Sequence, residues 1–434
     1  MRWIEVTRTD ALKGSLEMPG SKNSSLALLA ACCLSEEPVT LYKIPDISDV
    51  RMIYSILTDI GAKVIQENGK CVIDPRGIQS GDIRSDYASA YRASYYFIGA
   101  LLAKHKRVAI GYPGGDNFVS RPIDQHIKGL KALGARIEYF KDHYVVQAEK
   151  LVGTTIYFDC ITGGATLNIM MAAALAQGKT VLHNAARDPE VVDTAILLNK
   201  MGAKIYGAGT DVIRIQGVDA LGGCDHTVIP DRLIAGAYLM AAGATGGEVT
   251  VNNIIPEHLE ACMDKLKEIG MEFSVSENAV TAWSPTALKP TRVRTGKYPI
   301  LESDFQQPMT ALLLKAEGRS MVADKIYPLR FNHCEQLARM GASITVRSGA
   351  ARIDGGKTLT GAWVHAGDIR AGICLVLAGL MAEGTTFLTG IEHIERGYED
   401  IIGDFDRLGA KLRMSSSEGT MEELFSGSAI LRTY

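Results

Sequence analysis

Two glycine-bearing loops each contain a cationic residue, a lysine in the first and an arginine in the second. Each loop directly precedes an expected helix. Lys22 follows Pro19-Gly20-Ser21, and a cation there is unfavourable for the helix dipole unless an anion meets it. The loop lacks the spacing of a P-loop, and a solvated lysine would explain the pattern equally well. Arg396 precedes Gly397 in a similar setting, where either an anion site or a helix-flanking salt bridge would account for it.

A third loop, residues 111–126, is longer than the corresponding loops elsewhere in the chain. It contains adjacent glycines, which make a loop mobile, and long loops in compact proteins are often lids over a site. Its Asp116 and Arg121 could reach a bound ligand. A surface insertion without a function is the alternative interpretation.

A six-fold repeat supplies the elements that would position these side chains. A helix end, a glycine and a short strand recur every 68 to 73 residues, around Gly61, Gly134, Gly202, Gly270, Gly341 and Gly409. A fixed period of this size indicates a repeated structural unit. Glycine suits the left-handed position that ends a helix, and the residues that follow favour a strand.

An Ala-rich helix and a further strand precede each of these glycines. The expected helices are Ser25–Cys33, Ala93–Ala103, Leu167–Ala176, Ile234–Ala242, Thr310–Ala316 and Ile373–Ala382. Helices with small residues on all sides are typically buried, so we expect these six inside and sheets outside. The predicted unit of helix, strand, helix, strand is about 70 residues long.

The length of 434 residues favours two domains of three repeats each. We expect one domain over residues 21–229 and the other over 1–20 plus 230–434, with a loose tail over 414–434.

A net charge of −3 gives no reason to expect nucleic acid or an anionic membrane as partner, and the apolar stretches are too short to span a bilayer. The scattered cysteines and histidines predict a cytoplasmic protein with reduced thiols and no metal site.

A series of short motifs, in order along the repeats, carries a resemblance to a known family. The motifs are Gly20-Ser-Lys-Asn23, Tyr91-Arg-Ala-Ser94, Pro113-Gly-Gly115, Arg121-Pro-Ile-Asp124, Ala186-Arg-Asp-Pro-Glu-Val-Val-Asp193, Pro230-Asp-Arg232, Asp304-Phe-Gln306, Arg330-Phe-Asn-His333, Asp368-Ile-Arg370 and Arg396-Gly-Tyr-Glu399. Over residues 1–413 the chain resembles the enolpyruvyl transferases. Asn23 fits the branch of that family that acts on a sugar nucleotide.

The resemblance implies an α/β fold, a two-domain inside-out α/β barrel with the active site in the cleft between the domains, and no cofactor. The implied reaction moves the enolpyruvyl group of phosphoenolpyruvate onto the 3-hydroxyl of UDP-N-acetylglucosamine and releases phosphate, the first committed step of peptidoglycan synthesis. Phosphoenolpyruvate carries a phosphate and a carboxylate, and arginine binds such oxyanions in bidentate geometry. By the resemblance, Lys22, Arg121 and Arg396 bind it, and Arg92, Arg330 and Arg370 line the same cleft.

The same reaction needs an acid and a base, because a proton adds to the methylene carbon as the sugar oxygen adds to its neighbour. Asp304 matches the carboxylate that contacts the sugar hydroxyl and is the candidate base. It also precedes Phe305-Gln306, so a helix N-cap is the alternative interpretation. By the resemblance, the remaining residues that bind the sugar nucleotide are Asn23, Pro122, Ile123, Asp124, Gln125, Thr162, Gly163, Gly164 and Ile326.

The chain departs from the family at Asp116, where a cysteine that adds to phosphoenolpyruvate and is alkylated by fosfomycin is common. A carboxylate is a weaker nucleophile than a thiolate, but one whose pKa is raised by burial can transfer a proton. We therefore group Asp116 with Lys22, Asp304 and Arg396 as catalytic residues and expect insensitivity to fosfomycin. The chain also has Cys160 at a position where lysine is common, and its lid is altered. These two changes leave open the alternative that the enzyme acts on another acceptor, such as UMP. A catalytically silent paralogue that binds a UDP-sugar is the third alternative.

Overall fold

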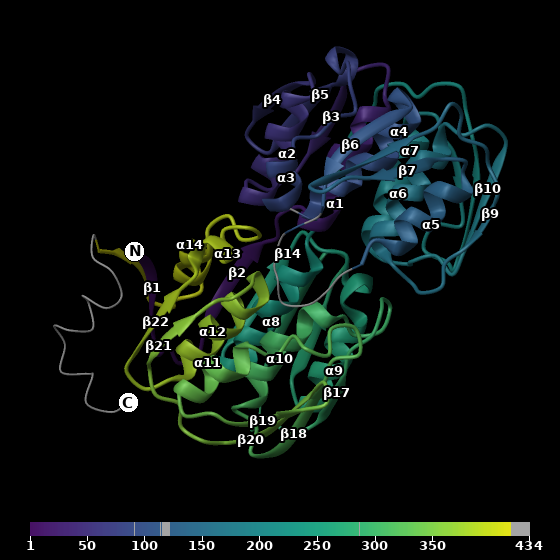
Figure 1. Cartoon of the computed structure of the whole chain (residues 1–434). Helices are drawn as coiled ribbons and strands as arrows, with labels where there is room; N and C mark the ends of the chain where they lie inside the picture. The colour runs from purple at the N-terminus through teal and green to yellow at the C-terminus, as the bar shows by residue number, and fades with distance from the viewer. Residues whose placement is uncertain (91, 113, 115–121, 286, 418–434) are drawn as a thin grey trace.

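The computed structural model describes residues 1–90, 92–112, 114, 122–285 and 287–417. Two candidate site residues, Asp116 and Arg121, lie outside this range, as does most of the predicted tail. Figure 1 shows two lobes. The first lobe comprises the elements from α1 to β13, and the second comprises β1, β2 and the elements from α8 to β23.

Six inner helices lie where the small residues predicted them. They are α1 (Lys22–Ala31), α4 (Tyr96–His105), α6 (Gly163–Ala174), α8 (Arg232–Thr245), α10 (Gln306–Leu313) and α12 (Ile369–Met381). In the first lobe α4 packs on both α1 and α6, and in the second α8, α10 and α12 pack pairwise. The backbones approach so closely that a Cβ on Gly99 would overlap the carbonyl oxygen of Asn168. The prediction that Ala-rich helices lie inside is confirmed.

Polar caps make three of these helices begin earlier than predicted. The Ser21 hydroxyl accepts a hydrogen bond from Ser24 N at 3.3 Å. Lys22 is therefore the first residue of α1, and the alternative interpretation of a solvated loop lysine is wrong. Asp231 caps α8 and Asp368 caps α12 by accepting from two backbone N–H groups each. Such caps satisfy amides that have no partner within the helix.

Small sheets cover the inner helices on the outside (Figure 1). In the first lobe they contain β3 (Val39–Tyr42), β4 (Lys63–Glu67), β5 (Lys70–Asp74), β6 (Arg107–Gly111), β7 (Arg136–Tyr139), β8 (His143–Gln147), β9 (Thr155–Tyr157), β10 (Lys179–His183), β11 (Lys204–Tyr206), β12 (Val212–Gln216) and β13 (Asp225–Thr227). Their strand orders are β13-β3-β5-β4, β6-β8-β7 and β11-β12-β10-β9.

The second lobe repeats this pattern and includes the start of the chain. Its strands are β1 (Arg2–Thr7), β2 (Lys13–Glu17), β14 (Glu248–Asn252), β15 (Glu272–Val275), β16 (Ala279–Trp283), β17 (Arg292–Arg294), β18 (Gly318–Ala323), β19 (Ser343–Arg347), β20 (Ala350–Gly355), β21 (Trp363–His365), β22 (Thr385–Thr389) and β23 (Leu412–Ser416). The orders are β15-β16-β14-β2, β17-β18-β20-β19 and β21-β22-β1-β23.

The repeating unit contains more strands than predicted. In the first unit β4 forms a hairpin with β5, and β3 pairs in parallel with the distant edge strand β13. The hairpin turn is Asn68-Gly69, both with positive φ, and Asn-Gly is the strongest short sequence signal for such a turn. The prediction of helix, strand, helix, strand included β3 and β4 but missed β5 and β13, although the turn residues marked β5.

The outer helices end at the glycines that define the repeat. The helices that end there are α2 (Ser48–Asp59), α5 (Asp124–Ala132), α7 (Pro189–Lys200), α9 (Glu260–Ile269), α11 (His333–Arg339) and α14 (Ile401–Arg407). Two short helices, α3 (Ser85–Ala90) and α13 (Ile391–Ile394), precede other segments. The six repeat glycines have φ between +86° and +109°, the left-handed region that favours glycine. The predicted role of these glycines is confirmed.

The buried apolar side chains form two large clusters. The first runs from Leu26 to Val228, and the second combines Ile4–Met18 with Leu233–Ala410. The two crossings of the chain lie side by side, because Gly20 and Pro230 form a β-bridge. The domain bounds at 20/21 and 229/230 remain a prediction, which these clusters support. Among the described residues, no helix combines the length and apolar character needed to cross a bilayer.

Candidate active site

A cleft of about 880 Å³ is lined by residues of both lobes. The predicted site residues that line it are Lys22, Asn23, Arg92, Pro122, Asp124, Gln125, Thr162, Gly163, Gly164, Asp304, Ile326, Arg330, Arg370 and Arg396. Ile123 does not line the cleft, because it packs against the apolar core of the first lobe. The structure therefore gathers most of the predicted residues around one space.

The N-termini of inner helices point to this cleft. Lys22 begins α1, Tyr96 begins α4, Gly163 begins α6, and Ile369 and Arg370 begin α12, and all of them line the cleft. A helix N-terminus carries a partial positive charge and free N–H groups, which attract anions. The helix dipoles and the cationic side chains therefore act in the same direction, toward binding of negatively charged ligands.

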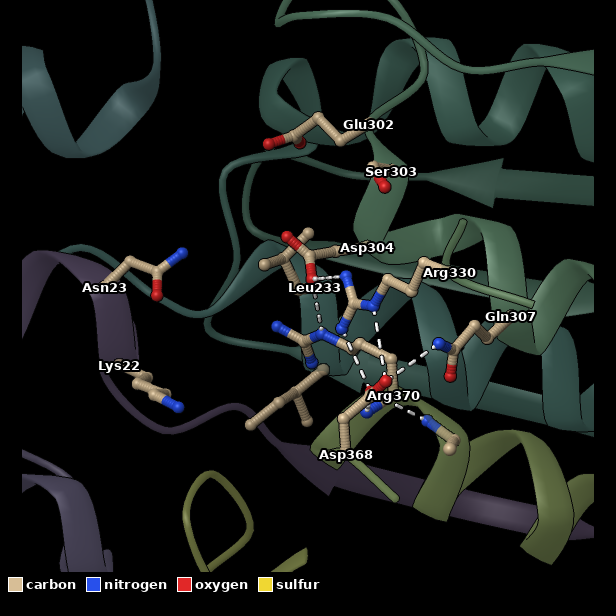
Figure 2. Close-up of polar contacts among 12 residues, drawn as sticks. Lys22, Asn23, Leu233, Glu302, Ser303, Asp304, Gln307, Arg330, Asp368 and Arg370 are labelled. Carbon is tan, nitrogen blue, oxygen red and sulfur yellow. Dashed lines mark hydrogen bonds and ion pairs between the residues drawn. The ribbon is translucent and has the colours of Figure 1, made fainter. Parts of the chain in front are cut away.

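Asp304 is the carboxylate at the centre of the second-lobe wall (Figure 2). Its Oδ1 accepts from Arg370 Nε at 3.1 Å and from Arg330 Nη1 at 3.4 Å, and its side chain is one-third exposed. Burial alone would raise the pKa of Asp304, but the two guanidinium groups outweigh it and lower the pKa to about 2. The carboxylate is therefore ionised and available to a ligand at neutral pH.

The alternative interpretation of Asp304 as a helix N-cap is wrong. Asp304 lies inside a short 3-10 helix, η5 (Ser303–Phe305), whose cap residue is Glu302, and the cap residue of α10 is Phe305. The polar contacts of the Asp304 side chain go to arginines of two other elements instead. The side chain of Asp304 therefore lines the cleft and does not cap a helix.

Asp368 holds the arginines beside Asp304 in place (Figure 2). Its carboxylate binds Arg330 through Nη2 at 3.0 Å and Nε at 3.3 Å, and accepts from Gln307 Nε2 at 3.0 Å. It also accepts from the backbone N–H of Arg370 at 2.8 Å. Burial disfavours the charge, but Arg330 outweighs this effect and lowers the pKa of Asp368. The sequence motif contained Asp368, but gave it no role of its own.

A third carboxylate, Asp49, joins cations of the two lobes. Lys22 Nζ lies 2.7 Å from its Oδ2, and Arg396 Nε lies 2.8 Å from its Oδ1. Asp49 lies in the first turn of α2 in the first lobe, whereas Arg396 follows α13 in the second. Arg396 thus forms a salt bridge, as one interpretation of its sequence position expected, and it also lines the cleft, so the anion site stays a prediction.

A buried ion network lies beside the cleft, between the lobes. Arg232 is 3% exposed, and it binds Glu190 of the first lobe at 2.9 Å and Glu302 of the second at 2.8 Å. Burial and the charges of Glu190 and Glu302 raise the pKa of the neighbouring Asp188 to about 7. Glu190 Oε1 is also 3.5 Å from Asn23 Nδ2. This network explains two motifs of the sequence that had no assigned role.

The part of the cleft predicted to bind the nucleotide lies in the first lobe. Gln125 exchanges two hydrogen bonds with Asp159, through Nε2 to Oδ2 at 3.1 Å and from Asp159 N to Oε1 at 2.9 Å. Arg92 Nε donates to the Tyr95 hydroxyl at 3.2 Å. Sequence reasoning missed further lining residues, among them Asp49, Tyr95, His126, Lys297, Lys325 and Tyr327. Among the described residues, no group of three or more His, Cys, Asp or Glu could hold a metal ion.

Comparison with known proteins gives consistent matches along most of the chain. The family model described as EPSP synthase (3-phosphoshikimate 1-carboxyvinyltransferase) matches residues 6–405. UDP-N-acetylglucosamine 1-carboxyvinyltransferase 2 of Geobacillus kaustophilus is 46% identical over 409 residues, which cover 94% of this chain and 96% of that protein. The protein of the same name from Bacillus subtilis is 46% identical over 422 residues, covering 96% and 98%.

Solved structures show the same fold. The enolpyruvyl transferase NikO from Streptomyces tendae superimposes with a TM-score of 0.86 at 22% identity, covering 96% of this chain and 99% of that one. EPSP synthase from Acinetobacter baumannii gives a TM-score of 0.71 at 18% identity, covering 96% and 100%. The predicted two-domain inside-out α/β fold is confirmed. The chain belongs to the EPSP synthase family, the enolpyruvyl transferases, and within it to the UDP-N-acetylglucosamine 1-carboxyvinyltransferases.

Proposed function

We propose that the protein transfers the enolpyruvyl group of phosphoenolpyruvate to the 3-hydroxyl of UDP-N-acetylglucosamine and releases phosphate. The observation that carries this proposal is a single cleft in which Lys22 and Arg396 lie near Asp304 and its two arginines. The relatives at 46% identity share the name of this activity. The proposal includes a role in peptidoglycan synthesis in the cytoplasm, with two small-molecule substrates, no cofactor, and neither nucleic acid nor membrane as partner.

The cations of the cleft suit the anionic substrate. Phosphoenolpyruvate presents a phosphate and a carboxylate, and arginine and lysine form strong charge-assisted hydrogen bonds to both. Lys22 and Arg396 would bind these groups together with Arg121, which lies outside the described residues. Holding the enol carbon beside the sugar hydroxyl turns an encounter of two molecules into a reaction within one complex.

The addition step requires movement of two protons. The sugar 3-oxygen bonds to C2 of the enolpyruvyl group while its proton leaves, and a proton adds to the methylene carbon, which gives a tetrahedral ketal. Loss of phosphate and of a methyl proton then restores the double bond. Asp304 would orient the hydroxyl and accept its proton, and anions of the substrates that bind Arg330 and Arg370 would raise its low basicity.

The sugar nucleotide would lie along the first-lobe wall. Asn23 would hold the sugar, and the amides at the start of α6, residues 162–164, would bind the diphosphate, because a helix N-terminus is a ready anion site. Pro122, Asp124 and Gln125 would contact the remainder of the nucleotide. Cys160, which is exposed at the same rim, leaves one fewer cation there than a lysine would.

Fosfomycin is expected not to inactivate the enzyme, because Asp116 replaces the thiol that the epoxide alkylates in the family. A carboxylate attacks the epoxide much more slowly than a thiolate does. Asp116→Cys is expected to gain time-dependent inactivation, whereas the wild type keeps full activity after preincubation. Time-dependent inactivation of the wild type that disappears in Asp116→Asn would contradict this prediction.

The identity of the product tests the proposal directly. Mass spectrometry of the nucleotide after incubation with phosphoenolpyruvate is expected to show one added enolpyruvyl group on UDP-N-acetylglucosamine, with one phosphate released for each. UMP in place of the sugar nucleotide is expected to remain unmodified. Binding of the sugar nucleotide without any product would favour the silent paralogue.

A further inference from the structure

The carboxylate of Asp49 touches two of the cations assigned to phosphoenolpyruvate, Lys22 and Arg396. Its Oδ2 is 2.7 Å from Lys22 Nζ and 3.3 Å from Arg396 Nη2, and its Oδ1 is 2.8 Å from Arg396 Nε. The residue is 4% exposed. The contact to Arg396 is the paired, planar geometry that a bound carboxylate or phosphate would also adopt.

Backbone contacts hold Asp49 and Arg396 together. Ser48 N, next to Asp49, donates to Glu395 O at 3.0 Å. Asp46 N donates to Glu399 Oε1 at 2.6 Å. The start of α2 in the first lobe is therefore docked on residues 395–399 of the second, so the Asp49–Arg396 pair does not depend on side-chain placement alone.

The carboxylate offsets a repulsion between the two cations. Lys22 and Arg396 come from different lobes, and without a negative charge between them they would repel each other. Burial disfavours the ionised form, but Lys22 and Arg396 outweigh it and lower the pKa of Asp49. The position of Asp49 in the first turn of α2 adds a favourable helix dipole. The three side chains together carry a net charge of +1.

We propose that Asp49 is a positioning residue that joins Lys22 and Arg396 into one site and makes that site discriminate against inorganic phosphate. A simple anion must compete with the Asp49 carboxylate for the same donors. Phosphoenolpyruvate carries two anionic groups and reaches further cations of the cleft, so it competes better. Because phosphate is the product, this competition favours its release. The inference rests on the proposed function, in which these cations bind phosphoenolpyruvate.

Asp49→Asn is expected to bind inorganic phosphate about fivefold more tightly than the wild type, because the competing charge is gone while the shape is kept. Calorimetric titration of the protein with phosphate alone measures this affinity. Asp49→Glu retains the charge and is expected to stay within about twofold of the wild type. In turnover, Asp49→Asn is expected to lower kcat about tenfold, because the cations lose their fixed spacing.

Asp46→Asn is the matched control, because Asp46 lies in the same segment and pairs with Arg51 on the surface. It is expected to leave phosphate affinity and kcat unchanged. An unchanged or weaker phosphate affinity in Asp49→Asn would overturn the inference, as would an equal gain in Asp49→Glu. If Asp49→Asn does not fold, as judged by thermal unfolding, Asp49→Ser is judged by the same criteria. Phosphate binding is measured without an acceptor, so a missing reaction with UDP-N-acetylglucosamine would remove the proposed function alone.

Discussion

Asp304→Asn is expected to lower kcat by about 10²- to 10⁴-fold, the usual contribution of a general base. The change keeps the shape of the side chain but removes the charge that receives the proton of the sugar hydroxyl. It also leaves Arg330 and Arg370 without their shared carboxylate, although Asp368 still binds Arg330. The KM for the sugar nucleotide is expected to change much less than kcat, since most of its contacts lie in the first lobe. Steady-state kinetics with both substrates varied measures the two effects.

Asp354→Asn provides a matched control for this variant. Asp354 also lies between two arginines, with Oδ1 2.9 Å from Arg319 Nε and Oδ2 3.6 Å from Arg352 Nη2, but it belongs to the outer strand β20. It is expected to leave kcat unchanged. A kcat for Asp304→Asn within about tenfold of the wild type would contradict the assignment of Asp304 as the base.

The pH profile adds a second readout for Asp304. Its pKa is lowered to about 2, so the carboxylate stays ionised at every pH above about 3. We therefore expect no acidic limb from this group in kcat/KM, which reports the free enzyme, between about pH 5 and 8. An acidic limb of kcat/KM near neutrality that disappears in Asp304→Asn would contradict the low pKa of Asp304 in the free enzyme.

Asp368→Ala is expected to destabilise the protein by about 3–5 kcal/mol, the cost of leaving one partner of a buried ion pair uncompensated. The variant leaves the buried Arg330 without this partner and removes the cap of α12. Asp368→Asn keeps a good capping side chain but not the charge, so this variant is expected to lose less stability than Asp368→Ala. Urea unfolding at neutral pH, followed by circular dichroism, measures this stability. The wild type is expected to be the most stable, Asp368→Asn less stable and Asp368→Ala the least stable.

The same comparison has a predicted dependence on pH. The folded-state pKa of Asp368 is lowered, so its stabilisation is complete above the unfolded pKa near 3.9 and is lost as the pH falls through the folded pKa. The difference in unfolding midpoint between the wild type and Asp368→Ala is therefore expected to narrow below about pH 4. Equal midpoints at neutral pH would contradict the proposed role of Asp368.

The repeat was readable from the sequence because its signals are local. A glycine that must adopt positive φ and a helix of small residues mark each unit wherever they occur. The additional strands of the first lobe, β5, β8, β9, β12 and β13, were missed because three to five residues carry little periodicity. The first inner helix was predicted to begin at Ser25 instead of Lys22, since the capping bond from Ser24 to Ser21 is a detail of one turn.

The site residues show the same difference between those marked by local motifs and those placed by distant contacts. Most cations were found, because the family motifs contain them. Asp49 was missed, since its partner Arg396 lies 347 residues away in the chain and no local pattern joins them. Asp368 was seen only as part of a motif, because its contact to Gln307 depends on the packing of α12 beside α10 and its partner Arg330 lies 38 residues away in the chain. Ile123 was assigned to the ligand by its position in a motif, but the side chain turns to the core.

Phosphate release from phosphoenolpyruvate, measured with UDP-N-acetylglucosamine, UMP or shikimate 3-phosphate as acceptor, tests the central claim most directly. The account predicts that phosphate is released when UDP-N-acetylglucosamine is the acceptor and not when UMP or shikimate 3-phosphate is. It also predicts that Asp304→Ala releases no phosphate with any of them. Release only with UMP or shikimate 3-phosphate would contradict the proposed acceptor. No release with any of the three, from a protein that still binds UDP-N-acetylglucosamine, would contradict the proposed catalysis.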